Sequence, residues 1–407
     1  AAMSPDPAAP ATPAQPPDRR RRRWRWVLVV VPLTLALLVG GAYVATAVME
    51  VPPPHTLAKL ETAPPSKWGE LFPYRTVEAG EPRVLEEAPA TMPDTVPWKG
   101  SEIPFDEFLT TTHTNSFLVL QDGRLAYEWY ADGVDGSTRQ SSFSMAKSLV
   151  SLLVGQAIGR GELTEDDRVV DLLPGYATGG EYDDVTVREL LDMTAGVDVS
   201  EVYNEYWPFT GTSRMYLTTD LPGFVHDHRS VDYTPGTKGV YRSVDTELLG
   251  LILAEVTGQN LSDLLSEGIW KPVGAEESAR WNLDHEGGVE KAFASVNATA
   301  RDFARVGQLV LDDGRVDGRQ VVPRAWITRI ETPAPLEVDG WEYSAQWWHP
   351  PGGDGADLSM LGVYGQYTYV NPETGTVIVK LSDHGTDQDE QETYDVLRSV
   401  ADHVSAE

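Results

Sequence analysis

The fold is decided by one stretch, Ser142-Phe143-Ser144-Met145-Ala146-Lys147-Ser148-Leu149-Val150, which contains the only Ser-x-x-Lys motif in the sequence. The mostly apolar run that follows, 149–158, predicts a buried helix ending near Gly159. Ser144 then lies at the helix N-terminus, with Lys147 one turn further on the same face. A hydroxyl beside a buried amine suits an acyl-transfer nucleophile, because burial and neighbouring charge can lower the pKa of the amine until it takes the proton. The alternative is that Ser144 caps a core helix and Lys147 is solvated.

The composition allows a real core and excludes two kinds of chemistry. Hydrophobic residues make up 41% of the 407 residues, enough for one large domain or two moderate ones. The chain has no Cys, which excludes disulfides and thiolate catalysis. The net charge is −30, and the first 50 residues carry more Arg than acidic residues, so the acidic excess lies after them. So acidic a body repels nucleic acid, and we expect no nucleic-acid partner.

The N-terminal region has the pattern of a membrane anchor. Residues 1–25 are rich in Ala and Pro and then in Arg, which predicts a disordered basic cytoplasmic arm. Residues 26–49 carry no charge and are long enough to span a bilayer as a helix. The Arg cluster before them predicts a single pass with the rest of the chain outside the cell. The alternative is a cleaved signal peptide ending near Ala45-Thr46-Ala47, which would make the protein secreted.

The remaining chain is expected to form an edge segment and one large domain. Residues 50–105 are rich in Pro and lack periodicity, which predicts a semi-rigid linker merging into the domain edge. An irregular segment packed on the body is the alternative. Residues 106–407 are expected to form the domain itself.

Strand patterns at both ends of this domain enclose a helical middle. The Asp-Gly pair in 116–130 and the turn in 366–381 predict two hairpins. Helical patterns lie between them and after them, at 187–193, 246–256, 300–311 and about 387–404. We therefore expect an α+β fold, in which distant segments complete one antiparallel sheet and a helical insertion occupies about 161–330.

Two further pieces of sequence fit the Ser144 helix. Tyr241 and Ser243 follow a Pro-Gly turn, and a Tyr hydroxyl near a cationic Lys can have a depressed pKa and relay protons to a leaving group. A buried packing role is the alternative for Tyr241. Gly362-Val363 lies before the second hairpin, where a glycine lets a substrate approach the backbone. The N–H groups of Val363 and Ser144 would then form an oxyanion hole, and a β-bulge is the alternative.

Taken together, these motifs resemble one superfamily in its own order along the chain. It is the serine β-lactamase and penicillin-binding protein superfamily, in its class C-like, esterase-like branch, with the 6-aminohexanoate-dimer (nylon oligomer) hydrolases as the nearest likeness. The resemblance covers about 110–385 and rests on the Ser144 motif, Leu190 to Val197, Pro235-Gly236 with Tyr241-Arg242-Ser243, Ser295 to Asp302, Gln346-Trp347-Trp348, and Gly362 to Gln366.

The resemblance implies a fold and a set of roles. An antiparallel sheet flanked by helices, with an all-helical insertion, would hold the site between them. Ser144 matches the nucleophile, Lys147 its partner and Tyr241 the family's catalytic Tyr. The resemblance also implies a pocket lined by Tyr203, Ser243, Trp347, Trp348, Gly362 and His384. It implies no cofactor.

One departure from the family pattern bears on the substrate. β-Lactamases and penicillin-binding proteins carry Lys-Thr-Gly on the strand beside the site. Here the equivalent is Met360-Leu361-Gly362, which offers no cation for a substrate carboxylate. We therefore expect a small neutral ester or amide as substrate.

Three other hypotheses stay open. The chain could be a D,D-peptidase or a β-lactam-binding protein of the cell wall, or a non-catalytic binding protein that keeps the fold. A metal enzyme is the third, because His226-Asp227-His228 has ligand-like spacing. The remaining His residues are scattered and Cys is absent, so we expect no metal site. The sequence predicts no particular oligomeric state.

Overall fold

The computed structural model describes residues 19–203, 210–353, 355–386 and 389–406, and the chain divides into two units, 1–49 and 50–407. In the first unit, helix α1 spans Arg19–Val48, so the Arg-rich end of the predicted arm is helical. The most apolar 18 residues within its part Trp26–Val48 have a mean hydropathy of 2.4. This part is long and apolar enough to cross a membrane, a property shared by signal sequences near an N-terminus. Residues 1–18 lie outside the described residues.

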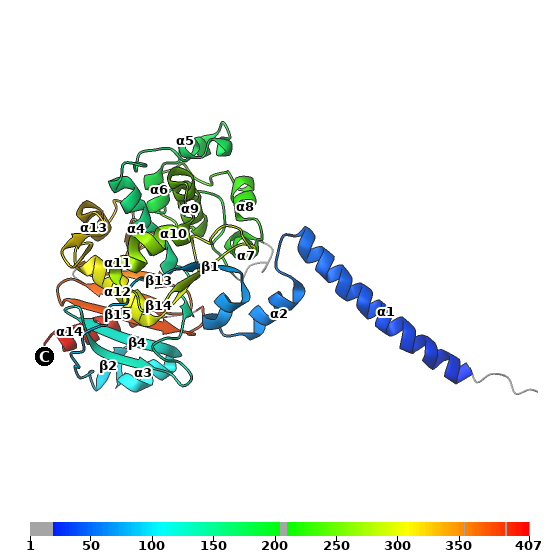
Figure 1. Cartoon of the computed structure of the whole chain (residues 1–407), viewed down its shortest axis with the longest axis horizontal. Helices are drawn as coiled ribbons and strands as arrows, with labels where there is room; N and C mark the ends of the chain where they lie inside the picture. The colour runs from blue at the N-terminus through cyan, green and yellow to red at the C-terminus, as the bar shows by residue number, and fades with distance from the viewer. Residues whose placement is uncertain (1–18, 204–209, 354, 387–388, 407) are drawn as a thin grey trace, which may run out of the picture. The chain divides into compact units, whose positions relative to one another are not determined.

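The second unit is organised on a seven-stranded antiparallel sheet (Figure 1). Its strands, in spatial order, are β11 (Glu342–Ser344), β12 (Trp347–His349), β13 (Leu358–Gly362), β14 (Gln366–Asn371), β15 (Thr376–Ser382), β4 (Thr114–Gln121) and β5 (Arg124–Tyr130). Both expected hairpins are present. The turn between β4 and β5 uses Asp122 and Gly123, both with positive φ, as a tight two-residue hairpin turn requires. Pairing of β15 with β4 joins segments about 260 residues apart, as expected from the strand patterns at both ends.

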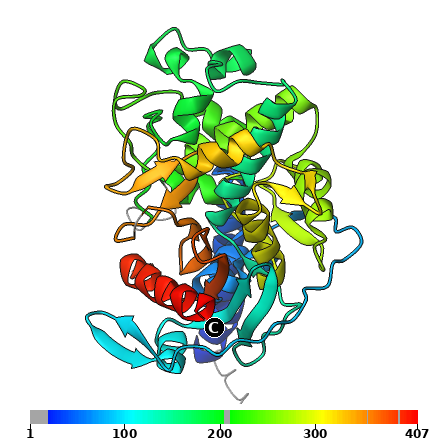
Figure 2. The same ribbon diagram turned by 90° about the vertical axis from the view of Figure 1, so that its left-hand side faces the viewer.

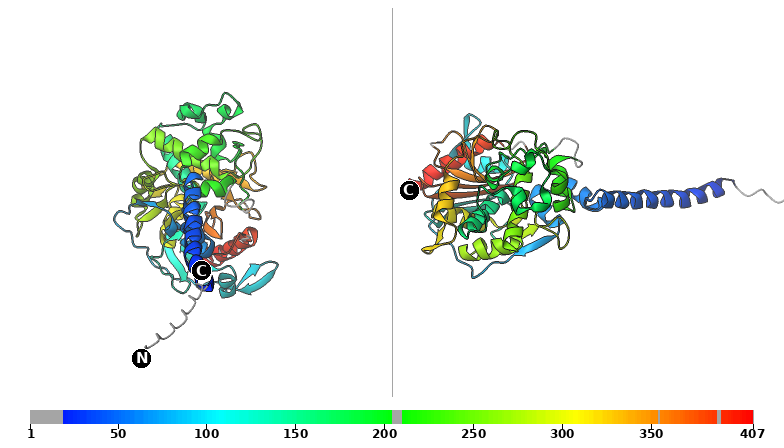
Figure 3. Two further views of the ribbon diagram at one scale, coloured as in Figure 1. Left: turned by 90° about the vertical axis from the view of Figure 1, so that its right-hand side faces the viewer. Right: turned by 90° about the horizontal axis from the view of Figure 1, so that it is seen from above.

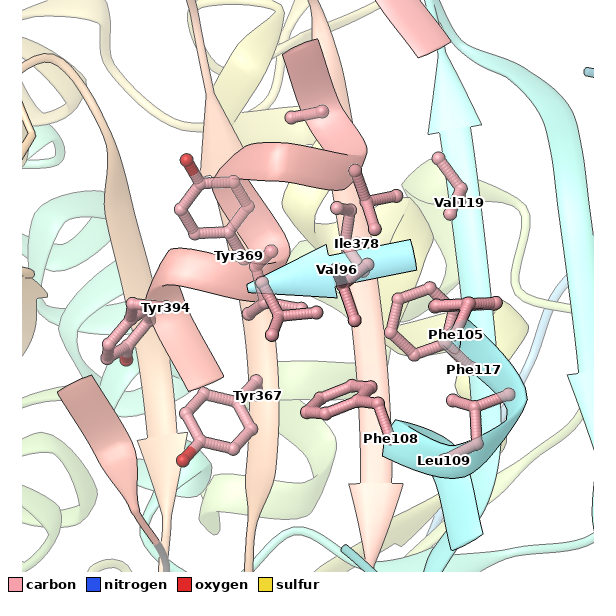
Figure 4. Close-up of a cluster of buried hydrophobic side chains, with 14 of the residues drawn as sticks. Val96, Phe105, Phe108, Leu109, Phe117, Val119, Tyr367, Tyr369, Ile378 and Tyr394 are labelled. Carbon is pink, nitrogen blue, oxygen red and sulfur yellow. The ribbon is translucent and has the colours of Figure 1, made fainter. Parts of the chain in front are cut away.

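The two faces of this sheet are covered by different helices. Helix α14 (Glu390–Ser405), helix α3 (Phe105–Thr111) and the hairpin of β2 (Thr95–Trp98) and β3 (Ser101–Pro104) lie on one face. Figure 4 shows side chains of β2, α3 and α14 meeting Phe117, Tyr367, Tyr369 and Ile378 of the strands. Helix α12 (Ala300–Leu311) covers the other face, where its Gly307 lies against Val377 and Thr368. The alternation between neighbouring strand residues is the period of two expected for a sheet buried on both sides.

Above the sheet lies the helical part of the unit (Figure 1). It comprises α4 (Met145–Gly159), α5 (Val169–Leu172), η2 (Pro174–Tyr176), η3 (Glu181–Asp184), α6 (Val187–Leu191), α7 (Gly211–Leu217), α8 (Leu221–Asp227), α9 (Ser243–Thr257), α10 (Leu261–Leu265), η4 (Ser266–Trp270) and α11 (Lys271–Val273). In the view from above in Figure 3, the green helices of this part lie in front of the orange strands. Helices α4 and α9 pack together and are apolar on most sides, as central buried helices are.

The stretch 161–330 is less uniformly helical than expected. It contains β7 (Ala279–Asn282) and β8 (Val296–Ala298), which form a four-stranded sheet with β1 (Tyr74–Val77) and β6 (Gln140–Ser141). It also contains the short pair β9 (Arg315–Val316) and β10 (Arg319–Gln320), followed by helix α13 (Arg324–Glu331). Within 161–330, the part without strands therefore ends at α11, before β7 begins. Strands of three or four residues show too little alternation to be recognised in sequence.

The Pro-rich residues after 50 are packed on the body, which differs from the linker interpretation and agrees with its alternative. Helix α2 (Pro54–Thr62) and the 3₁₀ helix η1 (Pro65–Leu71) lead into β1, which pairs with β7 about 200 residues later. The β2–β3 hairpin then packs on α14, seen in red beside the cyan hairpin in Figure 2. Because the partners of this segment are distant in sequence, its own residues show no periodic pattern.

Candidate active site

Ser144 stands at the N-terminal end of α4, as predicted. The residue before it, Phe143, has φ of +44°, an uncommon conformation for a bulky side chain. The Ser144 hydroxyl forms no helix-capping hydrogen bond. It lies instead 2.8 Å from the Lys147 Nζ. Ser144 therefore does not serve as a side-chain cap, and its hydroxyl is directed at the amine.

Lys147 is buried in a way that weakens its basicity. Its side chain is 1% exposed, and Nζ donates to the Phe293 carbonyl at 2.9 Å. Burial lowers the pKa of Lys147 to about 7, although the carboxylates of Glu201, Glu247 and Asp245 act in the opposite direction. The Lys147 amine is therefore neutral in a large fraction of molecules near neutral pH. This excludes the interpretation of Lys147 as a solvated surface residue.

Tyr241 lies beside this pair, and its pKa is raised rather than depressed. Tyr241 lines a cavity together with Ser144, and its ring centroid is 4.9 Å from the Lys147 Nζ. The ring also stacks on Trp348. Burial, reinforced by Glu201, raises the pKa of Tyr241 well above its usual value. The depressed pKa that a cationic neighbour can produce is not found here, because burial of the side chain has the larger effect. A raised pKa keeps the Tyr241 hydroxyl protonated, so it is suited to donate a proton rather than to act as a phenolate base.

Glu201 is a residue that the sequence reasoning missed. One of its carboxylate oxygens accepts from the Tyr203 hydroxyl at 2.7 Å and from the Ser243 hydroxyl at 2.6 Å. The other accepts from the Ser243 N–H at 2.9 Å and from Thr212 at 2.7 Å. Glu201 thus joins two predicted pocket residues and places a negative charge near Lys147. Its position two residues before Tyr203 was the one signal in the sequence, and a surface Glu has the same appearance.

The proposed oxyanion groups lie at the meeting of β13 and α4. A Cβ on Gly362 would come within 2.3 Å of the Ser142 carbonyl oxygen, so the end of β13 passes directly over the residues before Ser144. Val363 and Ser144 line the same two cavities. Within the described residues, neither Val363 nor Ser144 donates its N–H to another protein group. Both N–H groups are therefore available to a substrate oxygen.

Two cavities meet at Ser144, Tyr203 and Val363. The first, which we call the apolar cavity, has a volume of about 350 Å³. Its lining is mainly apolar and aromatic and includes Leu60, Ala63, Trp68, Phe143, Tyr216 and Phe293. The second, the acidic cavity, has a volume of about 280 Å³. Its lining includes Tyr241, Trp341, Trp348, Glu201, Asp339 and Glu390. Among the described residues, those lining the two cavities include no Lys or Arg.

The other predicted pocket residues divide into two groups. Tyr203, Ser243 and Trp348 line a cavity. Trp347 is fully buried within β12, outside the lining of both cavities. His384 also lies outside both linings, with its imidazole 3.1 Å from the Asp389 carboxylate. The structure therefore brings three of these residues to Ser144 and places Trp347, His384 and the packing residue Gly362 behind the cavity walls.

His226 and His228 are the residues with ligand-like spacing in the sequence. In the part of the chain that the structure describes, no group of three His, Cys, Asp or Glu side chains is placed to hold a metal ion. The His228 ring stacks on Phe224 and its Nδ1 lies 2.7 Å from the Phe224 carbonyl oxygen.

Comparison with known proteins identifies the family. A family model described as Beta-lactamase matches residues 110–402. The chain belongs to the β-lactamase family. This confirms the superfamily that the motifs resemble and the fold that follows from it. The chain is accordingly a serine hydrolase of the β-lactamase family.

Its relatives within the family include both amide hydrolases and penicillin-binding proteins. The chain is 29% identical over 349 residues to the 6-aminohexanoate-dimer hydrolase of Paenarthrobacter ureafaciens, covering 80% of this chain and 88% of that protein. It is 29% identical over 283 residues to penicillin-binding protein 4 of Amycolatopsis lactamdurans, covering 60% and 72%. A solved structure from Bacillus anthracis, assigned as a 6-aminohexanoate-dimer hydrolase, aligns with a TM-score of 0.75 at 25% identity and covers 84% of this chain and 94% of that one.

Proposed function

We propose that this chain is a membrane-anchored hydrolase that cleaves neutral esters or amides through an acyl-enzyme on Ser144. The observation that carries the proposal is the Ser144–Lys147 pair. The Lys147 Nζ lies 2.8 Å from the Ser144 Oγ, and burial lowers the pKa of Lys147 to about 7. A neutral amine at that distance is a competent base for the hydroxyl.

The remaining groups fit the steps of acyl transfer. The Ser144 hydroxyl proton moves to the Lys147 amine as Oγ attacks the substrate carbonyl carbon. The carbonyl oxygen becomes negatively charged and is bound by the N–H groups of Ser144 and Val363. The bond to the leaving group then breaks, and its nitrogen or oxygen takes a proton from the Tyr241 hydroxyl, which is replaced from the Lys147 ammonium. Water hydrolyses the ester on Ser144 by the reverse sequence of proton transfers.

The charges around the site favour a neutral substrate. The described residues lining the two cavities include four carboxylates, Glu61, Glu201, Asp339 and Glu390, and no Lys or Arg. A substrate carboxylate would therefore meet unfavourable charge. The relative from Paenarthrobacter ureafaciens is a 6-aminohexanoate-dimer hydrolase. We accordingly propose linear amides and simple esters as the first substrates to test.

A D,D-peptidase or β-lactam-binding activity is the second candidate. It is supported by the similarity to penicillin-binding protein 4 of Amycolatopsis lactamdurans. The same charges oppose it, because β-lactams and peptide C-termini carry a carboxylate. β13 carries Met360-Leu361-Gly362 where a Lys-Thr-Gly strand would supply a cation.

One labelling experiment separates the two candidates. The full chain in detergent is incubated with p-nitrophenyl butyrate, with the neutral amide butyranilide and with penicillin G, and the intact mass and the products are measured. We expect ester or amide turnover, its loss in Ser144→Ala, and no penicillin adduct. A stable penicillin adduct on Ser144 would move the second candidate to first place. Absence of any turnover and of any adduct in folded protein would refute a catalytic Ser144.

We further propose that α1 anchors the chain, with the Arg-rich end in the cytoplasm and residues 50–407 outside. Support comes from the 23 apolar residues Trp26–Val48 and from the Arg residues that precede them. Protease added to intact cells should digest the 50–407 unit while the chain sediments with membranes. Recovery of a shortened chain in the medium would instead show a cleaved signal sequence.

A further inference from the structure

Residues 50–72, which we call the strap, connect the two parts of the body beside the active site. At one end, the Glu50 carbonyl accepts from the Thr219 N–H at 2.8 Å, in the helical part. At the other end, the Ser66 N–H and hydroxyl donate to the Asp383 carboxylate at 2.7 Å and 2.8 Å, at the end of β15. Asn115 donates to the same carboxylate and fixes its orientation. The strap therefore crosses from the helices to the large sheet.

The end of the strap is closely packed against its neighbours. A Cβ on Gly69 would lie 1.7 Å from the Asn297 side-chain oxygen, so a side chain at this position would clash. The Gly69 carbonyl accepts from the Asn282 side chain at 2.9 Å. Since Asn282 and Asn297 belong to β7 and β8, the strap is attached to the second sheet as well.

Trp68 brings the strap against the proposed catalytic groups. Its ring lies edge-on to Phe143, at a centroid distance of 5.9 Å, and to Tyr364, at 5.5 Å. Phe143 is the residue before Ser144, and Tyr364 is the residue after Val363. The same ring lies 6.3 Å from Tyr216 in the helical part. The strap thus touches both neighbours of the reacting centre and closes the apolar cavity through Leu60, Ala63 and Trp68.

The position of Tyr241 indicates which part of the substrate each cavity would hold. Tyr241 lines the acidic cavity and is not among the residues of the apolar one. A leaving group must lie next to the proton donor, so it belongs on the acidic side. The acyl group, on the opposite side of the carbonyl carbon, then points into the apolar cavity. A mainly apolar lining of about 350 Å³ suits an aliphatic or aromatic chain.

We propose that the strap is the acyl-binding wall of the enzyme and sets the size of the acyl group that it accepts. The substrates are then esters or amides of an apolar carboxylic acid, with the acid's chain between the strap and the residues Phe143, Tyr216 and Phe293. The proposal rests on the proposed function, because it assigns one side of the bond that Ser144 attacks. Glu61 also lines this cavity with an exposed side chain, so a charged acyl terminus is the competing outcome.

The test varies the acyl chain while the leaving group stays constant. kcat/KM is measured for p-nitrophenyl acetate, butyrate and octanoate with the full chain in detergent. Ala63→Phe fills the cavity from the strap and should lower kcat/KM for octanoate at least about tenfold more than for acetate. Leu60→Ala enlarges the same wall and should shift the preference towards octanoate. Ala58→Phe, on the exposed face of α2, is the matched control and should leave the ratios unchanged.

A second series varies the alcohol of acetate esters from ethyl to octyl. Ala63→Phe should leave this series unchanged, since the alcohol lies on the acidic side. The proposal is overturned if Ala63→Phe and Leu60→Ala change kcat/KM by the same factor for all acyl chains. It is also overturned if either variant changes the preference among the alcohols. It is also overturned if a 6-aminohexanoyl ester is preferred over octanoate and Glu61→Gln abolishes that preference. If Ser144 of the wild-type enzyme is labelled but the variants give any of these contrary results, only the acyl-binding wall is refuted. If Ser144 of the folded wild-type enzyme is never labelled, the proposed function is refuted.

Discussion

At the scale of single residues, the proposed site contains a buried amine, that of Lys147, whose pKa of about 7 lies close to neutral pH. Desolvation of Lys147 is the largest influence on its pKa, and Glu201 opposes it most strongly. Glu201 also accepts hydrogen bonds from Tyr203 and Ser243, so one carboxylate both orders the pocket and adjusts the base. Tyr241, buried beside the same carboxylate, keeps its proton. The two groups that we propose to exchange protons during catalysis thereby have opposite roles.

The pH dependence of activity tests this assignment. Lys147 must be neutral to act, and burial lowers its pKa to about 7, so kcat/KM should rise with pH through an acid limb near 7. Glu201→Gln removes the main influence that raises this pKa, so the limb should move to lower pH. Glu61→Gln is the matched control, because Glu61 is not among the groups that shift Lys147. A limb that stays in place or moves upward in Glu201→Gln would contradict Lys147 as the base.

At the scale of elements, helix α4 is positioned by close packing along its length. Its first residues approach β14, since the Thr368 hydroxyl contacts the Met145 sulfur. Further along, Gly155 faces Trp326 of α13, and a Cβ there would lie 2.2 Å from the indole ring. The helix can approach α13 this closely because one position lacks a side chain. The depth of α4, and with it the burial of Lys147, follows from this packing.

Substituting Gly155 therefore tests how α4 is held. Ala is the better helix former by about 1 kcal/mol. The clash with Trp326 should nevertheless make Gly155→Ala destabilising by about 1–3 kcal/mol, measured by urea unfolding. Gly175→Ala is the control, because a Cβ at Gly175 has no atom within 4 Å and should change stability little. A Gly155→Ala protein as stable as wild type would show that α13 yields at this contact.

At the scale of the whole molecule, residues 50–407 form one unit that includes the strap. The strap is buried at Val51, Leu60 and Phe72 and hydrogen-bonded to both the helical part and the sheet. Residues that precede the family match at 110–402 thus complete the cavity beside Ser144. The region that the family model matches supplies the proposed catalytic groups, and the strap supplies part of the cavity wall.

Two truncations test this view of the molecule. A chain of residues 50–407 should fold with the thermal stability of the full chain, because 1–49 form a separate unit. A chain of residues 73–407 should lose at least about 3 kcal/mol, since the packing of Trp68 and Phe72 is removed along with the rest of the strap. Urea unfolding of the two proteins compares them directly. Equal midpoints would mean that the strap is dispensable for stability and that its attachments contribute little.

Much of this protein could be derived from local sequence patterns. The spacing of three between Ser144 and Lys147 places both on one helix face, whatever surrounds them. Asp122-Gly123 specifies a tight turn, and the alternation around it specifies two strands. The order of the motifs from Ser144 to Gly365 predicted the β-lactamase fold. These features depend on residues close together in the chain, so their geometry is fixed by backbone periodicity alone.

The tertiary structure decided the rest, because it depends on segments that meet only after folding. The direction in which the pKa of Tyr241 shifts could not be derived from sequence, since it is set by desolvation from residues of several elements. Glu201 and Trp68 gave little signal in sequence, because most of their partners are distant in the chain, such as Ser243 for Glu201 and Tyr364 for Trp68. The strap shows no periodicity because it is packed by contacts on three separate elements rather than on one face. Burial is a property of the whole molecule, and burial sets the charge of Lys147.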